Sequence, residues 1–382
     1  MAVLEQSQPV TAPAPAKQKK VGQSYASLVW WKFKRNRVAV VGGVILITFY
    51  LSFVFLPEII SPYDVQHSSD FAEAGPTPIH FVDQGKFNLR PFVYGMEQKL
   101  DFKTRARTYV EDTTRMYPIH FFVHGDPYKL FGFIPFDIHL YGVDQKSDPQ
   151  AIVLLLGADA LGRDWFTRIM YGGRLSLLIG LIGQFLTLFF GTALGVVSGF
   201  YGGAVDQLIQ RTTEFLSTFP EIPLFMALAA AIPPYVSPLA AYFVLTLILS
   251  FVRWGGLARQ VRGLILSLRE REYALAAKSA GASDARIMFR HLMPGTMSHV
   301  VVIATLAIPS MILAETALSW LGLGIRPPLT SWGVLLQDAA SVRAIHNTPW
   351  ELWTVPFILV TILAYNMLGD GMRDALDPYG AR

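Results

Sequence analysis

The chain has 382 residues, of which 52% are hydrophobic and 16% are charged, and its mean hydropathy is +0.38. Soluble globular proteins carry about 25% charged residues, so this composition argues against that class. The absence of cysteine excludes disulfides, Cys-based zinc sites and thiol nucleophiles. The net charge of +4 is small, and its distribution along the chain is more informative than its size.

The N-terminal region predicts an uncleaved membrane anchor. Its first residues, rich in Pro, Ala and Lys, have the composition of a disordered tail. The stretch "YASLVWWKFKRNR" predicts an interfacial helix with Trp30 and Trp31 at headgroup depth. The apolar run that follows, 38–55, is too long for a signal peptide and lacks a small-residue cleavage site. The cations before it place the N-terminus in the cytoplasm.

Six apolar runs are long enough to cross about 30 Å of hydrocarbon, which takes roughly 20 helical residues. They are 38–55, 176–200, 206–232, 239–254, 300–321 and 353–368. The third contains Arg211, Glu214 and two prolines, so its first half could lie at the interface or face protein. The sequence predicts an all-α polytopic membrane protein with about six transmembrane helices.

Alternation of the spans fixes the expected organisation. Residues 1–37 form the tail and interfacial helix, 38–56 the first span, 57–155 an insert on the outer face, and 156–382 the main membrane domain, whose loop 255–294 lies inside. Eight Lys and Arg between residues 253 and 290 are expected on the inner face, against Arg326 and Arg343 in the outer loop that follows. This bias agrees with the positive-inside rule.

The insert alternates polar with aromatic or β-branched residues between Gly and Pro, which predicts a small β-rich domain. Its four histidines, His80, His120, His124 and His139, show no metal-ligand spacing, so no metal site is expected. The aromatic residues Phe121, Phe122, Tyr128, Phe131 and Phe133 suit an interface, because aromatics are enriched at binding hot spots. Tyr128 and Phe131 are the predicted contacts with an outer partner.

Polar residues near the next span allow two interpretations. Asp159, Arg163 and Asp164 open an amphipathic segment on the outer side. They could serve as ordinary caps and surface ion pairs, or they could form an outer gate or a contact with an outer partner. By contrast, Gly191, Gly195 and Gly199 share one face of the span, and this spacing predicts close helix packing.

Three ionisable residues fall inside predicted spans. Glu315 lies in the fifth span, and Arg211 and Glu214 lie in the third. An intramembrane ionisable residue is a functional-site hypothesis by default. A structural interpretation is also open, because Glu315 can pair with Ser319 on the next turn or with a neighbouring span.

The inside stretch "EYALAAKSAGASDARIMFRHLMP", 272–294, predicts two short helices. Ala274, Ala277 and Gly281 share a nearly bare face of the first helix. Gly281 is placed to end that helix in the left-handed conformation, and Ser283 to cap the second one, which Pro294 ends. A flat alanine face binds lipid poorly, so the stretch is either a plain connector or a docking site for a cytoplasmic protein.

This stretch resembles the cytoplasmic coupling loop, or EAA loop, of permease subunits of bacterial ABC importers, and specifically the dipeptide, oligopeptide and nickel branch. The thirteen-residue spacing from Gly281 to Pro294 matches that family, whereas Leu275 stands where a Glu is expected and His291 where an Ile is expected. The segments "LLGADALGRDWFTRIMYGGRLSL", "ETALSWLGLG" and "NMLGDGMRDALDPYG" are also similar to that branch.

The resemblance implies the type I importer permease fold for a C-type second permease in the bacterial inner membrane, with both termini in the cytoplasm. The chain would form, with a homologous permease, the translocation path for peptides delivered by a periplasmic solute-binding protein. Two ABC ATPases would dock on the coupling loop. The loop residues implied are Glu272, Tyr273, Ala276, Ala277, Gly281, Ala282, Ser283, His291 and Pro294.

The same resemblance implies a non-enzymatic subunit without a cofactor and without a nucleic-acid partner. No G-x-x-x-x-G-K-[ST] motif occurs in the chain, so ATP and Mg would belong to the ATPases. Related architectures import opines, oligosaccharides or nickel chelates, and these substrates stay open. A secondary transporter would need an ion site, for which Glu315, Arg211 and Glu214 are the candidates. A membrane-anchored enzyme would need a catalytic constellation in the insert, where the sequence shows none.

Overall fold

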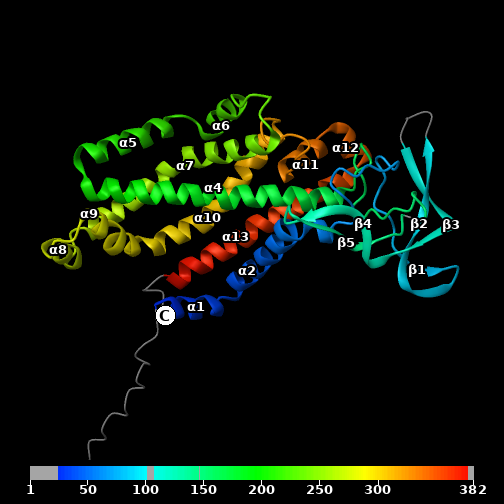
Figure 1. The fold of residues 1–382 in the computed structure, drawn as a ribbon, viewed down its shortest axis with the longest axis horizontal. Helices are drawn as coiled ribbons and strands as arrows, with labels where there is room; N and C mark the ends of the chain where they lie inside the picture. The colour runs from blue at the N-terminus through cyan, green and yellow to red at the C-terminus, as the bar shows by residue number, and fades with distance from the viewer. Residues whose placement is uncertain (1–24, 101–106, 146, 377–382) are drawn as a thin grey trace, which may run out of the picture.

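The computed structural model describes residues 25–100, 107–145 and 147–376. The predicted N-terminal tail and the last residues of the C-terminal motif lie outside this part of the chain. The membrane helices form a long bundle, the β-rich insert lies at one end, and the short helices α8 (Glu272–Ser279) and α9 (Asp284–Arg286) lie at the other (Figure 1).

Within the described residues, five helical stretches are long and apolar enough to cross a membrane. They are α2 (Arg37–Phe49) with the π-helix η1 (Tyr50–Phe55), α4 (Trp165–Tyr201), α7 (Pro238–Leu268), α9 with the π-helix η2 (Ile287–Leu292) and α10 (Met293–Trp320), and the 3₁₀-helix η3 (Pro349–Trp353) with α13 (Thr354–Leu376). The predicted all-α polytopic class with a β-rich insert is confirmed.

The third predicted span is not one helix, so this part of the prediction is wrong. The segment forms α5 (Gly203–Thr218) and α6 (Glu221–Ala230). Phe219 between them is extended, with φ −86° and ψ 137°, because the following Pro220 disfavours helical geometry in the residue before it. The two helices follow one another along one side of the bundle (Figure 1).

Helix α7 also runs further than predicted, because it includes residues 255–268 that were assigned to the inside loop. Its cations find partners on α5 instead of entering lipid. Arg262 forms two hydrogen bonds of 2.6 Å with the carboxylate of Asp206, and Arg259 contacts the Ser217 hydroxyl at 3.3 Å. Residues 269–283 therefore connect α7 to the helical stretch that begins at α9.

The glycines predicted for close packing bring α4 against α7. A Cβ added at Gly191 would lie 2.9 Å from Leu257 Cβ, and one at Gly195 would lie 2.7 Å from the carbonyl oxygen of Ala258. At Gly199 the nearest atom would be Ile265 Cβ, at 2.8 Å. Only hydrogen fits at these positions, which confirms the prediction of a close helix contact.

Shorter helices surround the spans. The end that carries α8 is called the inner end and the end that carries the insert the outer end, after the orientation that the sequence predicts. At the inner end, α1 (Tyr25–Arg35) exposes Trp30 and Trp31, with the Lys34 ammonium 4.9 Å from the Trp30 ring centroid and the Arg35 guanidinium 4.6 Å from that of Trp31. At the outer end lie α3 (Pro57–Ile60), α11 (Trp332–Ala339) and α12 (Val342–Asn347). Arg174 of α4 holds α3 through two hydrogen bonds to Glu58, of 2.6 and 2.7 Å.

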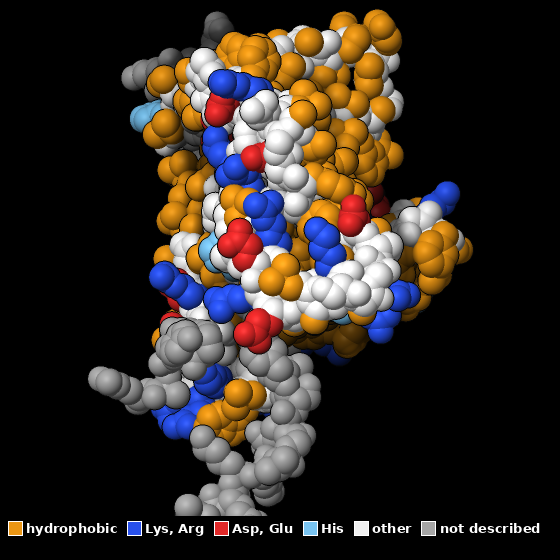
Figure 2. Space-filling view, turned by 90° about the vertical axis from the view of Figure 1, so that its left-hand side faces the viewer, with side chains coloured by type: hydrophobic (Ala, Val, Ile, Leu, Met, Phe, Trp, Pro, Cys, Tyr) orange, Lys and Arg blue, Asp and Glu red, His pale blue; other side chains and the backbone are white. Residues whose placement is uncertain are grey.

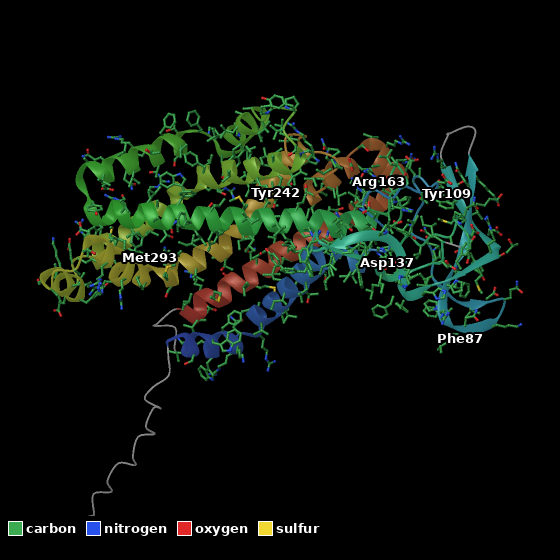
Figure 3. All side chains as sticks on the ribbon, viewed as in Figure 1. Phe87, Tyr109, Asp137, Arg163, Tyr242 and Met293 are labelled. Atoms are coloured by element: carbon green, nitrogen blue, oxygen red, sulfur yellow. The ribbon has the colours of Figure 1, made fainter. Side chains whose placement is uncertain are left out.

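The insert contains two antiparallel sheets in its described residues. One has the order β1 (His80–Asp83), β2 (Lys86–Leu100), β3 (Arg107–Pro118), and the other pairs β4 (His120–Leu130) with β5 (Ile134–Gly142). A hydrophobic core that includes Phe71, Val93 and Leu154 joins the first sheet to the parts of the insert that precede β1 and follow β5. Figure 3 shows Phe87 and Asp137 in this end of the molecule.

The α4–α7 contact predicts a difference between two matched substitutions. Gly195→Ala places its Cβ against backbone, whereas Gly43→Ala in α2 meets only Leu368 Cδ1 at an ordinary 3.7 Å. Both gain the same helix propensity, so the difference isolates packing. We expect Gly195→Ala to lower the melting temperature of the purified protein, with an overpacking cost of about 1–3 kcal/mol, and Gly43→Ala not to lower it. Equal shifts for the two variants would contradict the close contact.

Candidate functional site

The inside loop forms the predicted helix, turn and helix. Helix α8 ends at Ser279 with Ala280 as its C-cap, and Gly281 follows with a φ of +76°, the left-handed conformation predicted for it. The Ser283 side chain then caps α9 by accepting a hydrogen bond from the Arg286 N–H at 3.4 Å. Glu272, Tyr273, Ala276 and Gly281 are exposed, so the loop offers a free surface at the end of the bundle.

The bare alanine face does not point outward, which corrects the prediction for this face. Ala274 is 3% exposed and belongs to a hydrophobic cluster, and Ala277 and Ala282 pack against the same cluster. The exposed side of α8 carries Tyr273 and Leu275 instead. The small residues let α8 lie close to its own chain, and a partner would meet the larger side chains.

The cluster beneath α8, called here the inner cluster, connects the loop to three spans. Its buried members are Val196 of α4, Leu257, Val261 and Ile265 of α7, Ala274 of α8, Ile287, Met288 and Leu292 of η2, and Val300 of α10. A close-packed apolar cluster has low compressibility and transmits displacement. Displacement of α8 therefore acts directly on the inner ends of α4, α7 and α10.

Pro294 does not separate the second loop helix from the next span, which corrects that prediction. Residues 284–320 run as one helical stretch. Proline within a helix removes one hydrogen bond and clashes with the carbonyl four residues earlier. Here the π-helical segment η2 directly precedes it and changes that hydrogen-bond register. His291 lies in η2 and is half-buried.

At the outer end, the predicted polar group is mostly internal. The Asp159 carboxylate is buried and forms ion pairs with Arg163 Nε and Arg168 Nη1, both at 2.8 Å, and Arg168 also contacts Asp338 at 3.1 Å. Asp164 caps α4 by accepting a hydrogen bond from the Thr167 N–H at 2.7 Å. Burial, with Asp159 nearby, raises the pKa of Asp164 to about 6.

Asp159 and Asp164 thus make the internal ion pairs and the helix cap of the first interpretation, and their role in an outer gate or a partner contact stays a prediction. Arg163 lines a cavity of about 350 Å³ at this end, together with Glu73, Gln337 and Arg343, and Figure 3 labels it beside the helices of the outer end. Sequence reasoning missed Arg168, which joins Asp159 to Asp338 of α11. The sequence offered one indication of this role, which is that Arg168 lies one helical turn after Asp164 in the same polar segment.

Glu315 is fully buried in α10 and is held by hydroxyl groups. Ser319 donates to it at 2.7 Å, which confirms the predicted pairing, and Ser176 of α4 donates at 3.1 Å. The Ser176 oxygen in turn accepts the N–H of Trp332, the first residue of α11, at 3.1 Å. Glu315 thus joins α10, α4 and α11 into one polar node.

The other two intramembrane candidates lie elsewhere. Arg211 and Glu214 pair with each other across one turn of α5 at 3.0 Å, and both are exposed. The structure therefore does not bring them together with Glu315, as a shared ion-coupling site would require. Among the described residues, no group of three or more His, Cys, Asp or Glu side chains is arranged to hold a metal ion.

The β4–β5 hairpin separates the predicted outer contacts. Tyr128 is 8% exposed, donates a hydrogen bond to the carbonyl of Ile138 at 2.6 Å and packs on Phe136 and His139, so it belongs to the core of the hairpin and not to its surface. Phe131 and Phe133, in contrast, are exposed at its turn. The prediction is wrong for Tyr128, and Phe131 stays available for contact.

Comparison with known proteins agrees with this arrangement. The family model of the binding-protein-dependent transport system inner membrane component matches residues 191–379, and that of the N-terminal TM domain of oligopeptide transport permease C matches residues 24–76. The chain is 40% identical to the dipeptide transport system permease protein DppC of Alkalihalophilus pseudofirmus over 223 residues, which are 58% of this chain and 71% of that protein.

Two further relatives extend the same match. The chain is 37% identical to the oligopeptide transport system permease protein OppC of Bacillus subtilis, over 58% of this chain and 70% of that protein. It is 39% identical to the glutathione transport system permease protein GsiD of Pectobacterium atrosepticum, over 64% of this chain and 79% of that protein. The chain therefore belongs to the family of inner membrane components of binding-protein-dependent transport systems.

Proposed function

We propose that the chain is one of two homologous membrane subunits of an ABC importer for peptides. The relatives it matches are named for dipeptide, oligopeptide and glutathione transport, which are all peptide substrates. Two ATPases dock on the inside, and a solute-binding protein delivers peptide on the outside. ATP and Mg are bound by the ATPases, and this chain holds no cofactor of its own.

The observation that carries this proposal is the attachment of an exposed loop to the ends of three spans. Tyr273, Leu275 and Ala276 of α8 face outward, while Ala274 on the opposite side sits in the inner cluster. An ATPase that grips the exposed side and closes on ATP would pull α8, and the inner cluster would pass the movement to α4, α7 and α10. This is the mechanical requirement for alternating access driven by a separate ATPase.

The charge distribution supports an inner-membrane protein with this end in the cytoplasm. Figure 2 views the molecule from the end that carries α8, where Lys and Arg side chains lie interspersed with fewer Asp and Glu side chains. The chain between the end of α7 and the start of α10 contains Arg269, Arg271, Lys278, Arg286 and Arg290. By the positive-inside rule this end faces the cytoplasm, and the insert then faces the periplasm.

The first test separates strain from bulk in the coupling loop. Gly281→Val places a β-branched residue at positive φ, which costs about 1–2 kcal/mol, and nothing lies within 4 Å of the added Cβ, so the effect is conformational. We expect normal membrane insertion and loss of ATPase stimulation by loaded binding protein. Gly281→Asn is the matched control, because Asn tolerates this conformation, and it should keep most of the stimulation. Wild-type stimulation in Gly281→Val would rule out α8–Gly281–α9 as the coupling element.

The second test concerns orientation. The chain has no cysteine, so single cysteines give a clean background. Leu89→Cys, on the exposed strand β2, should react with an impermeant maleimide in intact spheroplasts. Ser283→Cys should react only in inside-out vesicles. Labelling of both positions from the same side would refute the proposed topology.

The third test concerns the exposed aromatic turn of the insert. Phe131→Asn combined with Phe133→Ser removes both rings, and Asn accommodates the positive φ of residue 131, which is +54°. If the turn contacts the binding protein, the concentration that half-saturates ATPase stimulation should rise about tenfold, which corresponds to about 1.4 kcal/mol. Tyr128→Phe, which changes only the interior of the hairpin, should leave that concentration unchanged. An unchanged value in the double variant would mean that the turn does not meet the binding protein.

A further inference from the structure

Three polar side chains from three helices meet on an open face of the membrane bundle. Glu221, the first residue of α6, forms an ion pair with Arg253 of α7. A second nitrogen of Arg253 donates to the Ser310 hydroxyl of α10 at 3.1 Å. The Glu221 side chain is 47% exposed and that of Arg253 is 20% exposed, so the pair is not enclosed by this chain.

These groups lie at the depth of the hydrocarbon. Fifteen residues of α7 precede Arg253 and fifteen follow it, because the helix runs from Pro238 to Leu268. At a rise of about 1.5 Å per residue, roughly 22 Å of helix lie on each side. The hydrocarbon core of a bilayer is about 30 Å thick, and wherever it is placed along the length of α7, Arg253 falls inside it. The same argument holds for Ser310 in α10.

The backbone beside Glu221 is also irregular. The break between α5 and α6 leaves Phe219 and Pro220 exposed beside Glu221. In α10, which continues through this level, Pro309 next to Ser310 has no N–H to donate to the helix. Irregular backbone at membrane depth occurs where it is buried in protein or lines a water-filled cavity, and not against lipid. An exposed ion pair is costly in lipid for the same reason.

The inner half of α7 continues this face with small and polar residues. Gly256, Gln260 and Gly263 are exposed at helical spacing, and the space where a Cβ would project from either glycine is open. The outer half of α7, where Figure 3 labels Tyr242, differs: its exposed residues include Phe243, Leu247 and Phe251. One helix thus exposes an apolar strip suited to lipid or a partner helix, and a polar strip that is suited to water.

We propose that Glu221, Arg253 and Ser310 line the translocation path and contact the peptide as it passes. This inference rests on the proposed import function. In the structure the two charges neutralise each other. A peptide brings an ammonium group and a carboxylate, so Glu221 can accept hydrogen bonds from the first while Arg253 donates to the second. The pair can therefore be exchanged for contacts with substrate without leaving either charge unpartnered at this depth.

The test uses single cysteines in the assembled importer, reconstituted in proteoliposomes with its ATPases and binding protein. Ser310→Cys is treated with the anionic reagent sulfonatoethyl methanethiosulfonate, and modification is followed by the mass of this chain. We expect reaction in at least one nucleotide state, at least tenfold faster than for Leu247→Cys, and slower reaction during turnover with trialanine. Tyr235→Cys is the positive control for reaction with the reagent, because Tyr235 lies in a loop and is 88% exposed.

The charge of the site gives a second readout. Arg253→Gln should slow the anionic reagent at Ser310→Cys and speed the cationic trimethylammonium analogue, so the ratio of the two rates should fall at least fivefold. Arg115→Gln, which removes a cation from an ion pair in the insert, should leave the ratio unchanged. It should also leave trialanine uptake unchanged, whereas Arg253→Gln and Glu221→Gln should each lower uptake at least tenfold.

Two outcomes would overturn the inference while leaving the import function standing. One is trialanine uptake by the complex with Ser310→Cys unreactive in every nucleotide state, which would mean that these residues are buried against the second permease. The other is a reactive Ser310→Cys with no protection by trialanine and normal uptake in Arg253→Gln. Failure of the wild-type complex to couple any uptake to ATP would instead refute the proposed function itself.

Discussion

Close approach along helix α4 is the constraint on which the rest of the bundle depends. Its glycines bring a different neighbour into contact at each level. An added Cβ at Gly173 would lie 2.8 Å from Phe53 of η1, one at Gly180 would lie 2.6 Å from Ile312 of α10, and one at Gly195 would meet α7. In lipid no hydrophobic force drives helices together, so contact area at short range must do so. A side chain at these positions would push three neighbouring helices away from α4, which is the axis of the fold.

That axis also explains how the two ends of the molecule can be coupled. At the inner end, the inner cluster binds α8 to α4, α7 and α10. At the outer end, the Glu315 node binds α10 and α4 to the start of α11, and Arg168 joins α4 to Asp338 of the same short helix. Because α4 and α10 contribute to both sites, a rotation of either helix at the loop must strain the hydrogen bonds around Glu315. A fully buried carboxylate is costly to leave without hydrogen-bond partners. The hydrogen bonds around Glu315 are therefore either all kept or broken together when the helices move.

Much of this could be predicted from the sequence, because the signals were local. Span length depends on one continuous run of residues, and the glycine spacing in α4, the left-handed turn at Gly281 and the Ser319 partner of Glu315 each depend on residues within about two helical turns. The errors came from long-range effects. Arg259 and Arg262 signalled a loop, yet Ser217 and Asp206 on α5 let the helix continue. Ala274 signalled a docking face, yet its small size serves the chain's own packing. Tyr128 is aromatic like its neighbours, and only the pairing of β4 with β5 turns it inward.

The way in which α5 and α6 are attached distinguishes them from the other helices. Their ties to α7 include three polar contacts in succession, from Asp206 to Arg262, Ser217 to Arg259 and Glu221 to Arg253. Within α5 the buried residue is Thr213, which packs where Gly255 leaves room, whereas α4 buries residues along its whole length. A polar contact beside water can be exchanged for another at little net cost, but the glycine contacts of α4 have no substitute partner. The bundle therefore has two parts. Helices α4, α7 and α10 are held by close packing, and α5 and α6 are held largely by polar contacts that can change partner. The proposed import by alternating access would need both parts, and the break at Pro220 lies where they meet.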